Sequence, residues 1–181
     1  GETEFLMDLA CDQDFSIAIV QKVADHLFKI GLESLRRANA YDTGIWIYDD
    51  MCNTLGPMFS PSVFEQVFLP AYKRMVSGFK AAGARWVVLH CDGNLAPLLD
   101  MIIDAGIDAI NPVEAAAGLD VVDLIGKYYG KLAFIGGVCN THILPGDDKN
   151  KIQQHVQSIV EAGANGGLII GPHSVGPDIE V

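Results

Sequence analysis

The chain has 181 residues, half of them hydrophobic and 8% aromatic, so it can bury one sizeable core. Its formal net charge of -11 would repel phosphate backbones, and its twelve Lys and Arg residues are scattered, which excludes nucleic acid as a partner. Asp, Lys, Arg or Gly interrupts each apolar run before the roughly 18 residues of a membrane span, so we expect no membrane association.

The cysteines indicate the compartment. All four (Cys11, Cys52, Cys91 and Cys139) lie outside any C-x-x-C pair, in a chain long enough to fold without disulfides. We therefore expect a cytoplasmic protein. No low-complexity linker divides the sequence, which predicts a single domain over residues 1–181. The chain begins inside a helical pattern and stops soon after an apolar strand, so we expect a piece of a longer product.

Short apolar runs, rich in β-branched residues, predict strands at 45–48, 86–89, 109–110, 132–135 and 168–170. Amphipathic helical patterns separate them, and this alternation is typical of a parallel sheet covered on its faces. The pattern fits either an open doubly wound sheet or part of an eight-stranded barrel. Because no G-x-G-x-x-G follows a strand, the nucleotide-binding open sheet is disfavoured, and we expect the barrel.

The helices have clear boundary signals. Ser60 is the expected N-cap of a helix that Pro70 should kink and that Gly83 should end. The same glycine C-cap is expected for two more helices, at 95–105 before Gly106 and at 149–162 before Gly163.

Polar residues follow almost every predicted strand: Asp49-Asp50, His90-Cys91-Asp92, Asn111 with Glu114, Cys139-Asn140, and His173-Ser174. In either α/β architecture, ligands bind at this carboxyl edge of the sheet. The sequence therefore predicts that residues from distant segments form one site there.

His90 and Asp92 flank Cys91, and in an extended backbone they would point to the same side, as a metal-binding pair would. The alternative is a turn in which Asp92 caps the next helix. A semi-buried carboxylate at Glu114 would be costly unless a cation or hydrogen bonds satisfied it, whereas an exposed one would only stabilise a helix N-terminus. His173 is either the third corner of this site or a solvated loop histidine.

The remaining candidates are weaker. Asp49 or Asp50 could contact a substrate's polar groups or cap a loop. Cys139 could be a thiolate ligand, but a small buried cysteine is more common. The other histidines have no companions, and we interpret them as structural: His26, His142 and His155.

Motifs over nearly the whole chain resemble the uroporphyrinogen decarboxylase superfamily. These motifs are Tyr48-Asp49-Asp50-Met51 with Gly56-Pro57-Met58-Phe59-Ser60-Pro61, Leu89-His90-Cys91-Asp92-Gly93-Asn94, Asn111-Pro112-Val113-Glu114 with Gly118-Leu119-Asp120, and Gly171-Pro172-His173-Ser174-Val175. The resemblance implies a (β/α)8 TIM barrel, present here as a C-terminal fragment of about five βα units.

The superfamily contains cofactor-free uroporphyrinogen decarboxylases and cobamide-dependent methyltransferases of the methylcobalamin:coenzyme M type, which use zinc to activate a thiol. The histidine at 90 and the Pro-Val-Glu at 112–114 resemble the methyltransferase branch. That resemblance implies a metal site at His90, Asp92, Glu114 and His173. Asp92 and His173 stand where that branch usually has thiolates, so this site would be harder and more open to Mn²⁺ or Fe²⁺.

From this resemblance we expect a zinc-dependent methyltransferase that moves a methyl group between a corrinoid, carried by a partner protein, and a small-molecule acceptor. The expected catalytic residues are Asp49, Asp50 and His173, and the expected cofactor-binding residues are Asn94, Asn111 and Cys139. One alternative is tetrapyrrole decarboxylation (a lyase reaction), with Asp49 or Asp50 and His173 facing the substrate. Another is a non-catalytic protein that binds a corrinoid or tetrapyrrole. The oligomeric state stays open.

Overall fold

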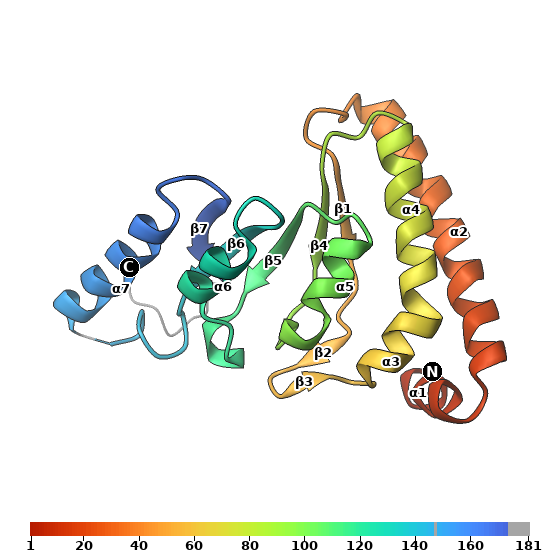
Figure 1. Ribbon diagram of the computed structural model, residues 1–181, viewed down its shortest axis with the longest axis horizontal. Coiled ribbons are helices and arrows are strands. Elements are labelled where there is room, and N and C mark those ends of the chain that lie inside the picture. The colour runs from red at the N-terminus through yellow and green to blue at the C-terminus, as the bar shows by residue number, and fades with distance from the viewer. Residues whose placement is uncertain (147, 174–181) are drawn as a thin grey trace. The chain divides into compact units, whose positions relative to one another are not determined.

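The computed structural model describes residues 1–146 and 148–173 and contains a five-stranded sheet with the strand order β1-β4-β5-β6-β7 (Figure 1). The strands are β1 (Ile45–Tyr48), β4 (Val87–His90), β5 (Ala109–Val113), β6 (Ala133–Val138) and β7 (Leu168–Pro172). Neighbours in the sheet follow one another in the chain. This confirms the α/β class and the adjacent strands expected of consecutive βα units.

The last three strands pair in parallel. Ala109 lies opposite Ala133, and Phe134 lies opposite Leu168. The register shifts between Ile110 and Val113, where a bulge interrupts the pairing of β5 with β6. Four of the strands run beyond their predicted ends, so His90 is the last residue of its strand rather than the first residue after it.

Contacts between Cα atoms divide the chain into two compact units. The first comprises Gly1–Ile47, Pro57–Val88 and Pro97–Asp108. The second comprises Tyr48–Gly56, Leu89–Ala96 and the chain from Ala109 onward. A single domain over residues 1–181 stays a prediction.

The first unit contains a layer of long helices. Its helices are α1 (Glu2–Cys11), α2 (Gln13–Ala38), α3 (Pro61–Val63), a π-helical turn (Phe64–Phe68), α4 (Leu69–Ala81) and α5 (Leu99–Asp104), the last preceded by a 3-10 turn at Ala96–Leu98. Figure 1 shows α2 and α4 side by side, and the rings of Phe28 and Phe79 lie 5.1 Å apart between them. Phe64 and Val67 are fully buried in this layer.

The boundary signals act largely as expected. The Ser60 side chain accepts a hydrogen bond from the Val63 amide and so caps α3. The π-helical turn ends two residues before Pro70, whose missing N–H and bulky ring prevent regular helical bonding. Gly83 (φ 102°) ends the helix in a conformation that favours glycine. Gly106 does likewise, whereas Gly163 caps α7 with φ -83°, a conformation open to any residue.

The second unit contains the carboxyl ends of β1 and β4 and the whole of β5, β6 and β7. It also contains the helices α6 (Val121–Tyr128) and α7 (Lys149–Ala162), with a 3-10 turn at Ala115–Ala117. A short two-stranded sheet pairs β2 (Cys52–Asn53) with β3 (Gly56–Pro57). The core of this unit includes Ile110, Phe134 and Ile159, each 1% exposed. The Asp120 side chain accepts from two amides at the start of α6, which satisfies donors that a helix N-terminus leaves free.

None of the helices in the described part of the chain combines the length and hydropathy that a membrane span requires.

Candidate metal site

Ionisable side chains gather at the carboxyl ends of the strands in the second unit. Among the described residues, two groups bring ligand atoms within 4.8 Å of one another, namely Asp92 with Glu114 and His173, and Asp50 with His90 and Asp92. Asp92 belongs to both groups. Three of the four predicted ligands therefore meet in the first group, and the fourth, His90, meets Asp92 in the second group together with Asp50, which was not predicted as a ligand. No described set holds all four predicted ligands at that spacing.

The first group joins the segments after β4, β5 and β7. Nε2 of His173 lies 3.3 Å from Oδ1 of Asp92, and both side chains are partly buried, at 23% and 47% exposure. Oε2 of Glu114 accepts a hydrogen bond of 3.0 Å from the Gly93 amide. This bond holds the Glu114 carboxylate beside the turn that carries Asp92.

The second group joins the segments after β1 and β4. Oδ1 of Asp50 accepts a hydrogen bond of 2.9 Å from the Asp92 amide. Nδ1 of His90 lies 2.8 Å from Oδ1 of Asn111 on the adjacent strand. The Tyr48 ring packs against the imidazole, with centroids 4.7 Å apart. Two neighbours thus fix the orientation of the His90 ring.

A glycine turn brings the carboxylates into place. Gly93 has φ 87°, and a Cβ atom added there would lie 2.5 Å from the Asn53 carbonyl oxygen, so only glycine fits without a shift. The Asn94 amide donates to the same oxygen at 2.8 Å. The Asn94 side chain accepts from the Ala96 amide, so Asn94 rather than Asp92 supports the start of the next helical segment. This leaves the carboxylate of Asp92 for the site.

The imidazole of His173 has a neighbour on its other nitrogen. Nδ2 of Asn140 lies 3.3 Å from Nδ1 of His173. Each predicted histidine ligand therefore has one ring nitrogen beside an asparagine amide, but only His90 has an amide oxygen there, the acceptor that fixes the tautomer of a histidine ligand in metal sites. Which atom of an asparagine amide faces the ring follows from the hydrogen bonds around it.

The buried cysteines belong to other contacts. The thiol of Cys91 forms a hydrogen bond with Cys52, and this bond lowers the pKa of Cys52 although burial acts in the opposite direction. The same bond, together with burial, raises the pKa of Cys91 far above its ordinary value, so Cys91 stays a neutral thiol. Sγ of Cys139 accepts from the His142 amide at 3.3 Å. None of these sulfurs joins either group among the described residues.

The other predicted residues have more local surroundings. Asp49 is half-buried, and its amide donates to the His90 carbonyl at 3.0 Å. The Cys139 amide donates to Nε2 of His155, which gives that histidine a structural role. Ser174 and Val175 of the last motif lie outside the described residues.

The sequence reasoning missed the grouping of Asp50 with His90. A signal for it exists, because Asp50 lies two residues after the end of β1 and Asp92 lies two residues after the end of β4. In adjacent parallel strands, equal offsets place two side chains at the same level of the sheet edge. The contact between Cys52 and Cys91 had no such signal.

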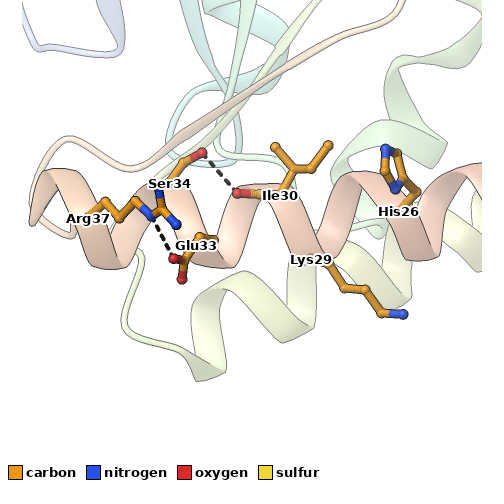
Figure 2. Close-up of a pocket in the computed structure, with 6 residues that line it drawn as sticks. All are labelled: His26, Lys29, Ile30, Glu33, Ser34 and Arg37. Atoms are coloured by element: carbon orange, nitrogen blue, oxygen red, sulfur yellow. Dashed lines mark hydrogen bonds and ion pairs between the residues drawn. The ribbon is translucent and has the colours of Figure 1, made fainter.

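A further hollow in the first unit is of a different kind. Figure 2 shows a pocket along α2 lined by His26, Lys29, Ile30, Glu33, Ser34 and Arg37. Two of its charged groups pair, since Glu33 contacts Arg37 at 2.6 Å, and Glu33 also contacts Arg36, which is outside the lining, at 2.7 Å. These bonds, chiefly that with Arg36, lower the pKa of Glu33 to about 2. We interpret this pocket as a solvated helix face.

The donors of the first group suit a divalent cation. Two atoms at roughly 2.1 Å from one tetrahedral cation lie about 3.4 Å apart. The distance of 3.3 Å between His173 and Asp92 matches this value. Two carboxylates and an imidazole form a set that accepts zinc and the harder Mn²⁺ or Fe²⁺. The residues present therefore fit a metal.

A parallel sheet in sequence order, with ionisable residues at its carboxyl edge, defines an α/β protein of the barrel class. The family model described as Uroporphyrinogen decarboxylase (URO-D) matches residues 4–181, and the chain belongs to this family. The fold is accordingly part of a TIM barrel of the uroporphyrinogen decarboxylase type.

Among solved structures, a methyltransferase from Methanosarcina mazei is similar, with a TM-score of 0.56 and 22% sequence identity. The match covers 75% of this chain and 37% of that one, so this chain spans little more than a third of its neighbour. At this identity the likeness shows the fold. No match was found among curated proteins.

Proposed function

We propose that this chain belongs to a metal-dependent methyltransferase that moves a methyl group between a corrinoid and a small acceptor. The observation that supports the proposal is the meeting of Asp92, Glu114 and His173 from three separate strand ends. Three protein ligands with an open position are typical of catalytic rather than structural zinc sites. The open position would take the acceptor.

In this proposal, Asp92, Glu114 and His173 hold the cation. A bound cation would act as a Lewis acid that lowers the pKa of an acceptor thiol or water. The Gly93 amide steadies Glu114 through its hydrogen bond of 3.0 Å. Nε2 of His173 faces Asp92, so it is the nitrogen that would bind. Nδ1 would then carry the proton, which requires the Asn140 amide to turn its oxygen, in place of its NH2 group, toward the ring.

The donor set affects the choice of acceptor. Carboxylates in place of thiolates leave less electron density on the cation, which makes a bound thiol a weaker nucleophile. Asp49 and Asp50 lie at the same edge of the sheet and are the groups we propose to contact the acceptor. The corrinoid would be carried by a partner protein, a proposal that rests on the family resemblance, as does a role for Asn94, Asn111 and Cys139 in binding it.

The four cysteines are free thiols in the structure, which supports the proposal of a cytoplasmic location.

Metal analysis combined with a methyl-transfer assay tests the proposed function. The purified protein should bind Zn²⁺ and transfer methyl groups from methylcobalamin to one of a panel of small thiols, followed by the change in corrinoid absorbance. Glu114→Gln and His173→Gln should lose both metal and transfer. His26→Gln, an exposed histidine of the first unit, should retain both.

The decarboxylase alternative gives the opposite result. Decarboxylation in this family needs no cofactor, so consumption of uroporphyrinogen by chelator-treated protein, without metal binding, would replace the methyltransferase proposal.

A further inference from the structure

We propose that Asp92 bridges two divalent cations, one held with Glu114 and His173 and the other held with Asp50 and His90. The first cation is that of the proposed function, on which this inference rests. The second position arises from the group of Asp50, His90 and Asp92, whose ligand atoms lie within 4.8 Å of one another. Both groups lie in the same compact unit.

The orientation of His90 supports the second position. Its Nδ1 lies 2.8 Å from Oδ1 of Asn111, and since that oxygen can only accept, Nδ1 carries the proton. The lone pair is then on Nε2. A histidine that donates one N–H to an oxygen acceptor and presents the other nitrogen is arranged as a metal ligand. The packed ring of Tyr48, with its centroid at 4.7 Å, holds the imidazole in this plane.

Charge balance supports a second cation. Asp50, Asp92 and Glu114 bring three carboxylates to one edge, and the Asp92 amide holds Asp50 close through a bond of 2.9 Å. Among the described residues, no lysine or arginine forms an ion pair with any of these carboxylates. Like charges so close repel one another, and bound cations would offset this repulsion. One divalent cation leaves this set negative by one charge, whereas two leave it positive by one, which suits an anionic ligand.

The two positions have the same donor types. Each has two carboxylates and one imidazole, so both would select the same class of ion: Zn²⁺, Mn²⁺ or Fe²⁺. Carboxylate-bridged cations in two-metal sites lie roughly 3.5–4 Å apart and can hold one substrate atom between them. The second cation would give the acceptor a second point of attachment and would exclude thiolate-loving Cu⁺ from the edge.

Titration with Mn²⁺ tests this inference. Chelator-treated protein should bind two equivalents by calorimetry, and its electron paramagnetic resonance spectrum should show the multiline signal of a coupled pair. Asp50→Asn should lose one equivalent and the coupled signal but keep the other equivalent. Glu114→Gln should lose the equivalent held by Glu114 and His173 and keep the one held by Asp50 and His90. Asp92→Asn should lower the affinity for both cations. Asp100→Asn, an exposed carboxylate in neither group, is the matched control and should bind as the parent does.

The outcomes separate this inference from the proposed function. One equivalent with retained methyl transfer would overturn the bridged pair and leave the proposed function standing. Two equivalents without spin coupling would also overturn it, because the ions would not share Asp92. No binding would overturn both. Circular dichroism of each variant shows whether a lost equivalent reflects a lost ligand or a lost fold.

Discussion

Nδ1 of His90, the last residue of β4, lies 2.8 Å from Oδ1 of Asn111, in the middle of β5. Residues that are 21 positions apart in the chain thus meet across adjacent strands. The asparagine fixes both the plane and the tautomer of the imidazole, so we propose it as a positioning residue for His90, the proposed ligand of the second cation.

Replacement of this partner should weaken metal binding without unfolding the protein. We expect Asn111→Ala to lower the affinity for Zn²⁺ roughly 10- to 100-fold, because the imidazole loses its acceptor. Asn111→Asp keeps an acceptor oxygen at the same place and should retain affinity. A competition titration with a chromophoric chelator measures both. Equal affinities for the parent and Asn111→Ala would contradict a positioning role.

Gly93 should tolerate no side chain. Two features disfavour alanine at this position. Gly93 has a φ of 87°, and a Cβ atom there would lie 2.5 Å from the Asn53 carbonyl oxygen. Gly130 has φ 71° but nothing within 4 Å, so Gly130→Ala measures the backbone cost alone, about 1–2 kcal/mol. Gly93→Ala should cost a further ~1–3 kcal/mol of unfolding free energy from crowding. Urea denaturation compares the two variants, and equal losses would refute the close contact.

The core of the second unit should depend on Phe134. This residue is 1% exposed on β6, and its ring lies 6.4 Å from that of Tyr128. Phe134→Ala should lower the free energy of unfolding by about 3–5 kcal/mol, since it removes buried apolar surface and leaves a cavity. Ile169 on the adjacent strand is 64% exposed, so Ile169→Ala should change it by less than about 0.5 kcal/mol. Similar losses of unfolding free energy for both variants would contradict a core centred on Phe134.

The ion pairs of Glu33 with Arg36 and Arg37 predict a small, salt-sensitive dependence of stability on pH. The folded pKa of Glu33, about 2, lies below the ordinary 4.5, chiefly because of Arg36 and then Arg37. A depressed pKa stabilises the fold above pH 4.5, and this contribution is lost as the pH falls toward 2. The melting temperatures of the parent and Glu33→Gln should therefore converge over this range. Because the pair is exposed, high salt should shrink their difference at pH 7. A difference that grows on acidification would contradict this assignment.

Local patterns in the sequence were sufficient to predict the main strands and helices. The continuous apolar run at 86–89 identifies a buried strand, because both faces of a parallel sheet are covered, and Val87, Val88 and Leu89 of β4 are buried. The run at 45–48 also forms a strand, although Trp46 and Tyr48 in β1 are exposed. Ser60 and Gly83 mark helix ends because a capping side chain and a left-handed backbone are local requirements. The strand-end position of His90, Asp92 and Glu114 followed from the same reasoning, since parallel strands end at a common edge.

Only the tertiary structure decided which ligands share a position. The sequence placed His90, Asp92, Glu114 and His173 at one edge, but their distances depend on strand register and on the turn at Gly93. That turn requires the Asn53 carbonyl, which lies in a separate segment of the chain. It draws Glu114 to Asp92 through the Gly93 amide, and Asp50 reaches the Asp92 amide from β1. Such contacts link residues that no local pattern relates, because hydrogen bonds between strand ends form only after the sheet has set its register.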